Sequence, residues 1–296
     1  DGVQIAEVTI TDDEPLRTVT LGFDTTSVNE NAGSGAITIT ATQSGQAQAD
    51  TIVNLGVSGD ALASGTDYTL NSSSITIAGG TTTGTTTIDI VNDVIDEGDN
   101  ETFTVEISSV TGGNGASESG TQSETAMILD DDTAGFTKTS PESNGAWYSG
   151  PLYVNEGAVA ETFTVVLNTQ PTADVIFDIT SNDESRFVAY ATADNSSTLT
   201  FNETNWNIDQ SVTTYTVDNQ KYNPTLYTRK IRVDPTNSSV DSIYAGLSLT
   251  EVDRYFERYY RLVDTDVIGI TASKSNVTIN ESGSGTTDTF TVGLDT

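Results

Sequence analysis

The sequence Ala36-Ile-Thr-Ile-Thr-Ala41 alternates strictly between apolar and polar residues, and this alternation recurs along most of the chain. Ile37 and Ile39 share one face of an extended segment, because successive side chains of a strand point to opposite faces. The same pattern occurs in three further runs, at residues 51–57, 85–91 and 102–107. Alternating runs rich in β-branched residues and separated by Gly, Asn, Asp and Ser predict half-buried antiparallel strands.

The number of such runs sets the expected architecture. Between Leu16 and Asp132 there are about seven, which suits one two-sheet sandwich in which each strand buries one face. The sequence therefore predicts an all-β fold of tandem antiparallel Greek-key β-sandwiches of the immunoglobulin-like kind.

Composition excludes several classes of function. The 296 residues carry a formal net charge of −32, with 43 acidic and 11 basic residues, no His and no Cys. Binding of nucleic acid or of an anionic membrane requires clustered Lys and Arg, so neither is expected as a partner. Without His or Cys there is no Ser-His-Asp triad, no Cys-His pair and no ordinary zinc site. We expect no enzyme, and no apolar run is long enough for membrane insertion.

An internal repeat appears when three Asn-Glu pairs are aligned. Glu30, Glu156 and Glu281 lie 126 and 125 residues apart, and each precedes a turn rich in small residues and then an alternating strand. This spacing predicts four segments: the last strand of a preceding sandwich (1–14), two complete sandwiches (15–132 and 133–266), and the first strands of a further sandwich (267–296). The chain is thus expected to be a section of a longer protein.

Acidic runs close the repeats. They occur at residues 9–14, 127–133 and 262–266, and the second contains the triplet Asp130-Asp-Asp132. Two like charges about 4 Å apart repel by roughly 4 kcal/mol at an effective dielectric constant of about 20. Adjacent carboxylates at similar places in each repeat therefore indicate a bound cation.

The first repeat resembles a Calx-beta domain, the sandwich named from the regulatory region of sodium–calcium exchangers and found in bacterial surface proteins. The resemblance covers residues 18–132 and rests on four elements in order, namely 28–30 (Val-Asn-Glu), 65–68 (Gly-Thr-Asp-Tyr), 93–103 (Asp-Val-Ile-Asp-Glu-Gly-Asp-Asn-Glu-Thr-Phe) and 128–132 (Ile-Leu-Asp-Asp-Asp). Asn100 departs from the family pattern as an extra residue. In the second repeat, residues 199–207 and 210–213 resemble a repeat of large bacterial adhesins, and the Gly-Thr-Asp-Tyr element is missing.

The resemblance implies calcium bound at one end of the sandwich. Ca²⁺ takes six to eight oxygen ligands and needs neither His nor Cys. Carried over by position, the ligands in the first repeat are Glu30, Asp67, Asp93, Glu97, Glu101, Asp130, Asp131 and Asp132. The corresponding candidates in the second repeat are Glu156, Asp183, Asp218, Asp264 and Asp266. The alternative for both sets is a solvated acidic surface, as in a protein adapted to high salt.

Residues 251–263 fit a helix and a strand equally well by periodicity. The resemblance and the aromatic content favour a strand leading into Asp264, preceded by a short helical insertion. Six of the basic residues lie here and at 229–232. They are expected to pair with carboxylates on neighbouring strands, or alternatively to dock another subunit or an acidic glycan.

These observations predict a calcium-stiffened spacer or adhesion module of an extracellular or cell-surface protein. Its partners would be the neighbouring repeats of the same chain, with other subunits or surface glycans as further candidates. The alternative is a structural subunit that assembles into an extracellular filament, sheath or surface layer.

Overall fold

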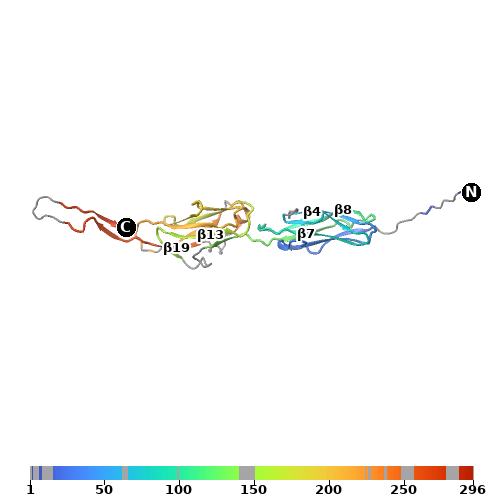
Figure 1. Cartoon of the computed structure of the whole chain (residues 1–296), viewed down its shortest axis with the longest axis horizontal. Coiled ribbons are helices and arrows are strands. Elements are labelled where there is room, and N and C mark those ends of the chain that lie inside the picture. The colour runs from blue at the N-terminus through green and yellow to red at the C-terminus, as the bar shows by residue number, and fades with distance from the viewer. Residues whose placement is uncertain are drawn as a thin grey trace. The chain divides into compact units, whose positions relative to one another are not determined.

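The computed structural model describes residues 2, 7–8, 16–61, 66–98, 100–139, 151–223, 225, 228–236, 239–247, 257–277 and 287–295. The chain divides into two compact units, Asp1–Asp132 and Thr133–Thr296, in which nearly every described element is a strand (Figure 1). The all-β fold class predicted from the alternation is confirmed.

The first unit is a sandwich of two five-stranded sheets. One sheet has the order β5 (Tyr68–Leu70), β7 (Thr83–Ile90), β3 (Ile37–Gln43), β1 (Thr18–Phe23) and β9 (Ser117–Glu118). The other has the order β2 (Ser27–Asn29), β10 (Ser123–Leu129), β8 (Glu101–Gly112), β4 (Thr51–Gly59) and β6 (Ser74–Ile77). The pairs β1–β9 and β2–β10 are parallel and the remaining pairs are antiparallel. A 3₁₀ turn, η1 (Glu30–Ala32), follows β2 directly.

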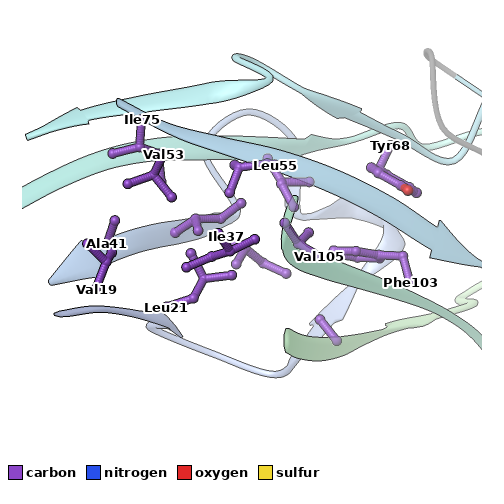
Figure 2. Packing of buried hydrophobic residues seen from close by; sticks show 14 of the residues in the cluster. Val19, Leu21, Ile37, Ala41, Val53, Leu55, Tyr68, Ile75, Phe103 and Val105 are labelled. Atoms are coloured by element: carbon purple, nitrogen blue, oxygen red, sulfur yellow. The ribbon is translucent and has the colours of Figure 1, made fainter. Parts of the chain in front are cut away.

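The alternating residues form the core of this sandwich. Ile37 pairs with Ile88 across β3 and β7, and both side chains are fully buried together with Ile39. Figure 2 shows branched side chains from both sheets meeting between them, with Tyr68 and Phe103 at one end of the layer. These two rings stack with centroids 4.4 Å apart. The core thus extends up to the sandwich end that carries the acidic loops.

In its described residues, the sandwich of the second unit repeats this plan with one strand fewer. One sheet has the order β11 (Phe136–Thr139), β13 (Val159–Leu167), β17 (Gln210–Thr216) and β15 (Phe187–Ala191). The other has the order β12 (Leu152–Asn155), β19 (Glu257–Val263), β18 (Thr228–Pro235), β14 (Val175–Ser181) and β16 (Thr198–Phe201). A short helix, α1 (Ser242–Gly246), lies between β18 and β19, and Asp241 caps it by accepting the backbone N–H of Tyr244. The same unit contains a two-stranded sheet of β20 (Gly269–Ala272) and β21 (Val292–Asp295).

The ambiguous segment at 251–263 is a strand where the structure describes it, from Glu257 to Val263. Arg258, Tyr260 and Leu262 are buried on the same face, as strand spacing predicts. Nε of Arg258 lies 2.8 Å from Oε2 of Glu161 on β13, so this arginine pairs with a carboxylate across the core. Residues 248–256 lie outside the described part.

The predicted end segments are only partly described. Residues 1, 3–6 and 9–15 lie outside the described part, so the closing strand expected at 1–14 stays a prediction. Residues 278–286 and 296 are likewise outside it. The further sandwich expected to begin at 267 also stays a prediction, although β20 and β21 pair within that segment.

Candidate metal centre

Strand pairing brings the acidic residues of the first unit to one end of the sandwich. β2 and β10 are parallel neighbours with Asn29 opposite Leu129, so the residues that follow them leave the sheet at the same edge. Those residues are Glu30 and Asp130. In the other sheet Tyr68, the first residue of β5, pairs with Ile90, the last residue of β7. Asp67, which precedes β5, and the segment with Asp93, which follows β7, therefore lie at the same end of the sandwich.

Three carboxylates form a close group there. One oxygen each from Glu30, Asp130 and Asp132 lie within 4.8 Å of one another, and we call these residues the first carboxylate group. Asp130 and Asp132 are partly buried and Glu30 is only 5% exposed. Three negative charges at this separation repel strongly unless they are neutralised by a cation or by protons.

Glu30 is the buried member of this group. Its Oε1 accepts the backbone N–H of Asp93 at 2.7 Å, whereas its Oε2 is buried and has no hydrogen-bond donor among the described residues. Burial raises the pKa of Glu30, and the charges of Asp93, Asp130 and Asp132 raise it further, against the effect of the hydrogen bond. A buried carboxylate oxygen is costly unless it is paired, so this atom indicates a place for a cation.

Backbone hydrogen bonds fix the orientation of the neighbouring carboxylates. Oδ1 of Asp130 accepts the N–H of Asp132 at 2.8 Å, and its Oδ2 accepts the N–H of Glu97 at 3.1 Å. Oδ1 of Asp93 accepts the N–H of Ile95 at 2.8 Å in the same type of turn. These bonds hold the side chains in place and leave further lone pairs available for a metal ion.

A small cavity lies between these residues and two more glutamates. It has a free volume of about 10 Å³ and is lined by one apolar side chain, Ile128, and five carboxylates, namely Glu30, Asp67, Glu97, Glu101 and Asp130. This volume corresponds to about one water-sized sphere. The cavity therefore suits a single ion and excludes an organic ligand.

The two glutamates of the cavity have strongly shifted pKa values. Burial raises the pKa of Glu97 to about 8, with added repulsion from Asp93, Glu30, Asp130 and Glu101. Burial also raises the pKa of Glu101 to about 7, together with a hydrogen bond to Asp67 and the charges of Asp67, Asp60 and Asp93. In the absence of a cation, protons neutralise part of this charge at neutral pH.

Other acidic residues at this end play different parts. Asp131 is exposed and accepts a hydrogen bond from Nδ2 of Asn31 at 2.6 Å, so the structure does not bring it into the first carboxylate group. Asp132 belongs to that group, and burial and its acidic neighbours raise its pKa. Asp99 lies outside the described residues.

Asp60 was not predicted and lies beside Glu101. Its Oδ1 accepts the N–H and the Oγ1–H of Thr102, each at 2.7 Å, and these bonds lower its pKa. A signal was present in the sequence, because Asp60 directly follows β4 and so stands at a strand end like the other acidic residues.

The second unit has an equivalent group made of Glu156, Asp264 and Asp266, which we call the second carboxylate group. One oxygen from each lies within 4.8 Å of the others. Glu156 is 6% exposed, and its Oε1 accepts the N–H of Thr265 at 3.1 Å. Its Oε2 is buried, and no residue in the described part of the chain donates to it. Burial raises the pKa of Glu156, and its contact with Asp264 and the charge of Asp266 add to this.

The other two candidates of the second unit lie outside this group. Asp183 forms an ion pair with Arg229 at 2.6 Å and accepts a hydrogen bond from Oγ of Ser185 at 2.6 Å. The serine bond and the arginine hold the pKa of Asp183 below its ordinary value. Asp218 is exposed, and its Oδ1 accepts the N–H of Gln220 at 2.9 Å.

The fold and the site define a β-sandwich module with a carboxylate metal centre at one end. Hard cations prefer such oxygen ligands. Residues 5–132 match the family model of the Calx-beta domain, so the first unit is a Calx-beta domain. The predicted resemblance is thereby confirmed for this unit. No curated protein matches the chain.

Among solved structures, the chain is similar to CBD12 from CALX1.2, with 17% identity over 82% of this chain and 100% of that chain and a TM-score of 0.33. The apo-form Calx CBD1 domain is 20% identical over 39% of this chain and 99% of its own, with a TM-score of 0.33. Domains 4 and 5 of the S-layer protein SbsC are 14% identical over 68% of this chain and 78% of theirs, with a TM-score of 0.26. Within the described residues, none of the helices has the length and apolar character that a membrane crossing requires.

Proposed function

We propose that the first unit binds Ca²⁺ through the first carboxylate group and the glutamates of its cavity. The observation that carries this proposal is the buried Oε2 of Glu30, to which none of the described residues donates a hydrogen bond and which belongs to a group of three carboxylates within 4.8 Å. A divalent cation there would neutralise charge that the protein otherwise neutralises with protons on Glu97 and Glu101. The Calx-beta identity of this unit supports the same ion.

Calcium fits this donor set better than magnesium. Ca²⁺ accepts six to eight oxygens in flexible geometry, whereas Mg²⁺ demands a near-ideal octahedron and gives up its waters reluctantly. The candidate donors come from separate segments, namely η1, the loop between β7 and β8, the first residue of β8 and the residues after β10. Such an assembly can adjust to a large ion more easily than it can enforce a small octahedral one.

The direct test is a calcium titration of the full chain after chelation, followed by calorimetry. Glu30→Gln removes one buried charge and keeps the shape of the side chain. Glu106→Gln is the matched control, because Glu106 is exposed on β8. Loss of affinity in the first variant alone supports the site, and equal titrations of both variants and the wild type would reject it.

The module is further proposed to act as an extracellular spacer that calcium stiffens. Asp132 belongs to the first carboxylate group and is also the last residue of the first unit. An ion held there would restrain the backbone that leads into the second unit. With about 1 mM calcium outside the cell, a site with a Kd of roughly 10⁻⁴ M gains about 1.4 kcal/mol of stabilisation.

Small-angle scattering in EGTA and in calcium tests the spacer role. The expected result is a monomer whose interdomain flexibility decreases when calcium is added. Unchanged flexibility would reject stiffening even where binding is measured, and calcium-dependent polymers would favour the alternative role as an assembling structural subunit.

A further inference from the structure

Arg261 on β19 differs from the other arginines of its sheet. Three of those arginines form ion pairs with carboxylates at distances of 2.6 to 3.1 Å, namely Arg229, Arg232 and Arg258. Arg261 forms no ion pair within the described residues, although the chain contains 43 acidic residues. Its charge therefore serves neither the core nor a carboxylate on a neighbouring strand there.

Tyr153 holds this arginine in place. β12 and β19 pair in parallel with Tyr153 opposite Arg261. Nη1 of Arg261 donates to the phenol oxygen of Tyr153 at 2.8 Å, and the guanidinium carbon lies 5.6 Å from the centre of the ring. Nε is buried, whereas Nη2 is open to solvent and donates to none of the described residues. Arg261 is thus oriented by a ring that is itself 57% exposed, and it keeps a donor for a ligand.

The next strand adds a second cation and a second ring. Lys230 on β18 pairs with Tyr259 on β19, and both lie on the outer face of the sheet, because the residues that alternate with them are buried in the core. Arg261 is two residues from Tyr259 and so shares this face. We call Tyr153, Lys230, Tyr259 and Arg261 the basic aromatic patch.

The size of the patch limits what it can bind. Neighbouring strands lie about 4.8 Å apart, so the three strands of the patch span roughly 10 Å. A stable protein interface buries about 800 Å² on each partner, which is more than four partly covered side chains provide. Two linked sugar rings, in contrast, have dimensions similar to those of the patch.

The charges of the patch select an anionic ligand despite the net charge of −32. Charges are screened beyond about 8 Å at physiological ionic strength, so a short ligand responds mainly to the groups it contacts. Asp234 lies four residues from Lys230 along β18, roughly 13 Å away, and is already paired with Arg232. A guanidinium binds a carboxylate through charge-assisted hydrogen bonds, and an exposed phenol ring offers an apolar face with a polar edge.

We infer that the basic aromatic patch binds a uronic acid residue of a polysaccharide. Arg261 takes the sugar carboxylate, Tyr153 contacts the sugar ring, and Lys230 takes a hydroxyl or the carboxylate of the next sugar. The second unit then attaches to an acidic glycan through the face of one sheet. This site is independent of the calcium site proposed for the first unit.

Calorimetric titration of the full chain with trigalacturonate at millimolar concentration tests the inference. EGTA is present throughout, because calcium would bridge uronates to the carboxylate groups. The wild type is expected to bind trigalacturonate, and the fully methyl-esterified trisaccharide, which lacks the charges, is expected to bind about tenfold more weakly or less well still.

Three variants locate the binding. Arg261→Gln should weaken it by about tenfold or more, because it removes the charge that takes the carboxylate. Tyr153→Phe keeps the ring and removes only the oxygen that orients Arg261, so it should weaken binding by a smaller factor. Lys221→Gln removes one positive charge at an exposed position of the same unit and should leave the affinity unchanged. Melting temperatures of all variants show whether the fold is kept.

The inference is overturned if the wild type does not bind trigalacturonate, or if the methyl ester binds equally well. Equal affinities of the wild type and a folded Arg261→Gln variant would also overturn it. So would self-association in EGTA that Arg261→Gln abolishes while the sugar has no effect, because the patch would then belong to an interface between two copies of the chain.

Discussion

Calcium binding to the first unit should release protons at neutral pH. Glu97 and Glu101 have pKa values of about 8 and about 7 in the metal-free protein, and a carboxylate must lose its proton to bind the ion. At pH 7 the first group is mostly protonated and the second about half protonated, so binding releases on the order of one proton. At pH 9 the same groups retain only about 0.1 proton between them.

Isothermal calorimetry in two buffers measures this release. The observed binding enthalpy is recorded at pH 7 in PIPES and in Tris, whose ionisation enthalpies differ, and the difference gives the number of protons released. Glu97→Gln should reduce that number by about 0.9, because it removes the group with the higher pKa. An enthalpy independent of buffer at pH 7, or the same proton release at pH 7 and pH 9, would refute the assignment of these glutamates to the ion site.

Three further predictions concern stability. Because the pKa values of Glu97 and Glu101 are raised in the folded state, their contribution to the stability of the metal-free first unit is complete below their ordinary pKa of 4.5 and is lost as the pH rises to about 8. Calorimetric scans in EGTA should show the melting temperature falling over this range, and a melting temperature independent of pH would contradict it. Glu30→Gln should raise the metal-free melting temperature of this unit while abolishing its rise with calcium, whereas Glu106→Gln should do neither. Arg258→Met should destabilise the second unit by about 3–5 kcal/mol because it removes the guanidinium that neutralises the buried carboxylate of Glu161. Denaturation followed by the fluorescence of Trp206, which packs against the core of this unit, measures the loss. Lys221→Met, at an exposed position of the same unit, is the control.

Most of the fold could be predicted because alternation is a local property of the sequence. Ile37 and Ile39 are buried as their spacing predicts, and the same rule places Arg258 on the buried face of β19. Alternation does not predict which residue pairs with a buried charged side chain. Glu161 lies 97 residues from Arg258, and only the sheet arrangement brings the two together.

The sequence predicts the location of the candidate site better than it predicts which residues form the site. Acidic residues at strand ends meet because neighbouring strands end at the same edge of a sheet, which brings Glu30 to Asp130. Strand alternation does not resolve the triplet, because Asp130 to Asp132 follow the end of β10 and Asp130 accepts the N–H of Asp132 in a turn. No such local rule predicts that Asp183 pairs with Arg229, because that contact depends on how β14 and β18 are placed.

The positions that differ between the two units show why a sandwich end can change its electrostatics without changing its fold. Asp67 and Arg186 occupy equivalent backbone positions, because each directly precedes an edge strand, β5 or β15, and accepts through its carbonyl oxygen the N–H of Val91 or Val217. The buried ring that follows each one supplies the packing. Neither contribution depends on the side chain at that position, so the fold tolerates an anion or a cation there. The carboxylate groups are constrained differently. In the part of the chain that the structure describes, nothing donates a hydrogen bond to one buried oxygen of Glu30 and one of Glu156, so each group needs positive charge from some source.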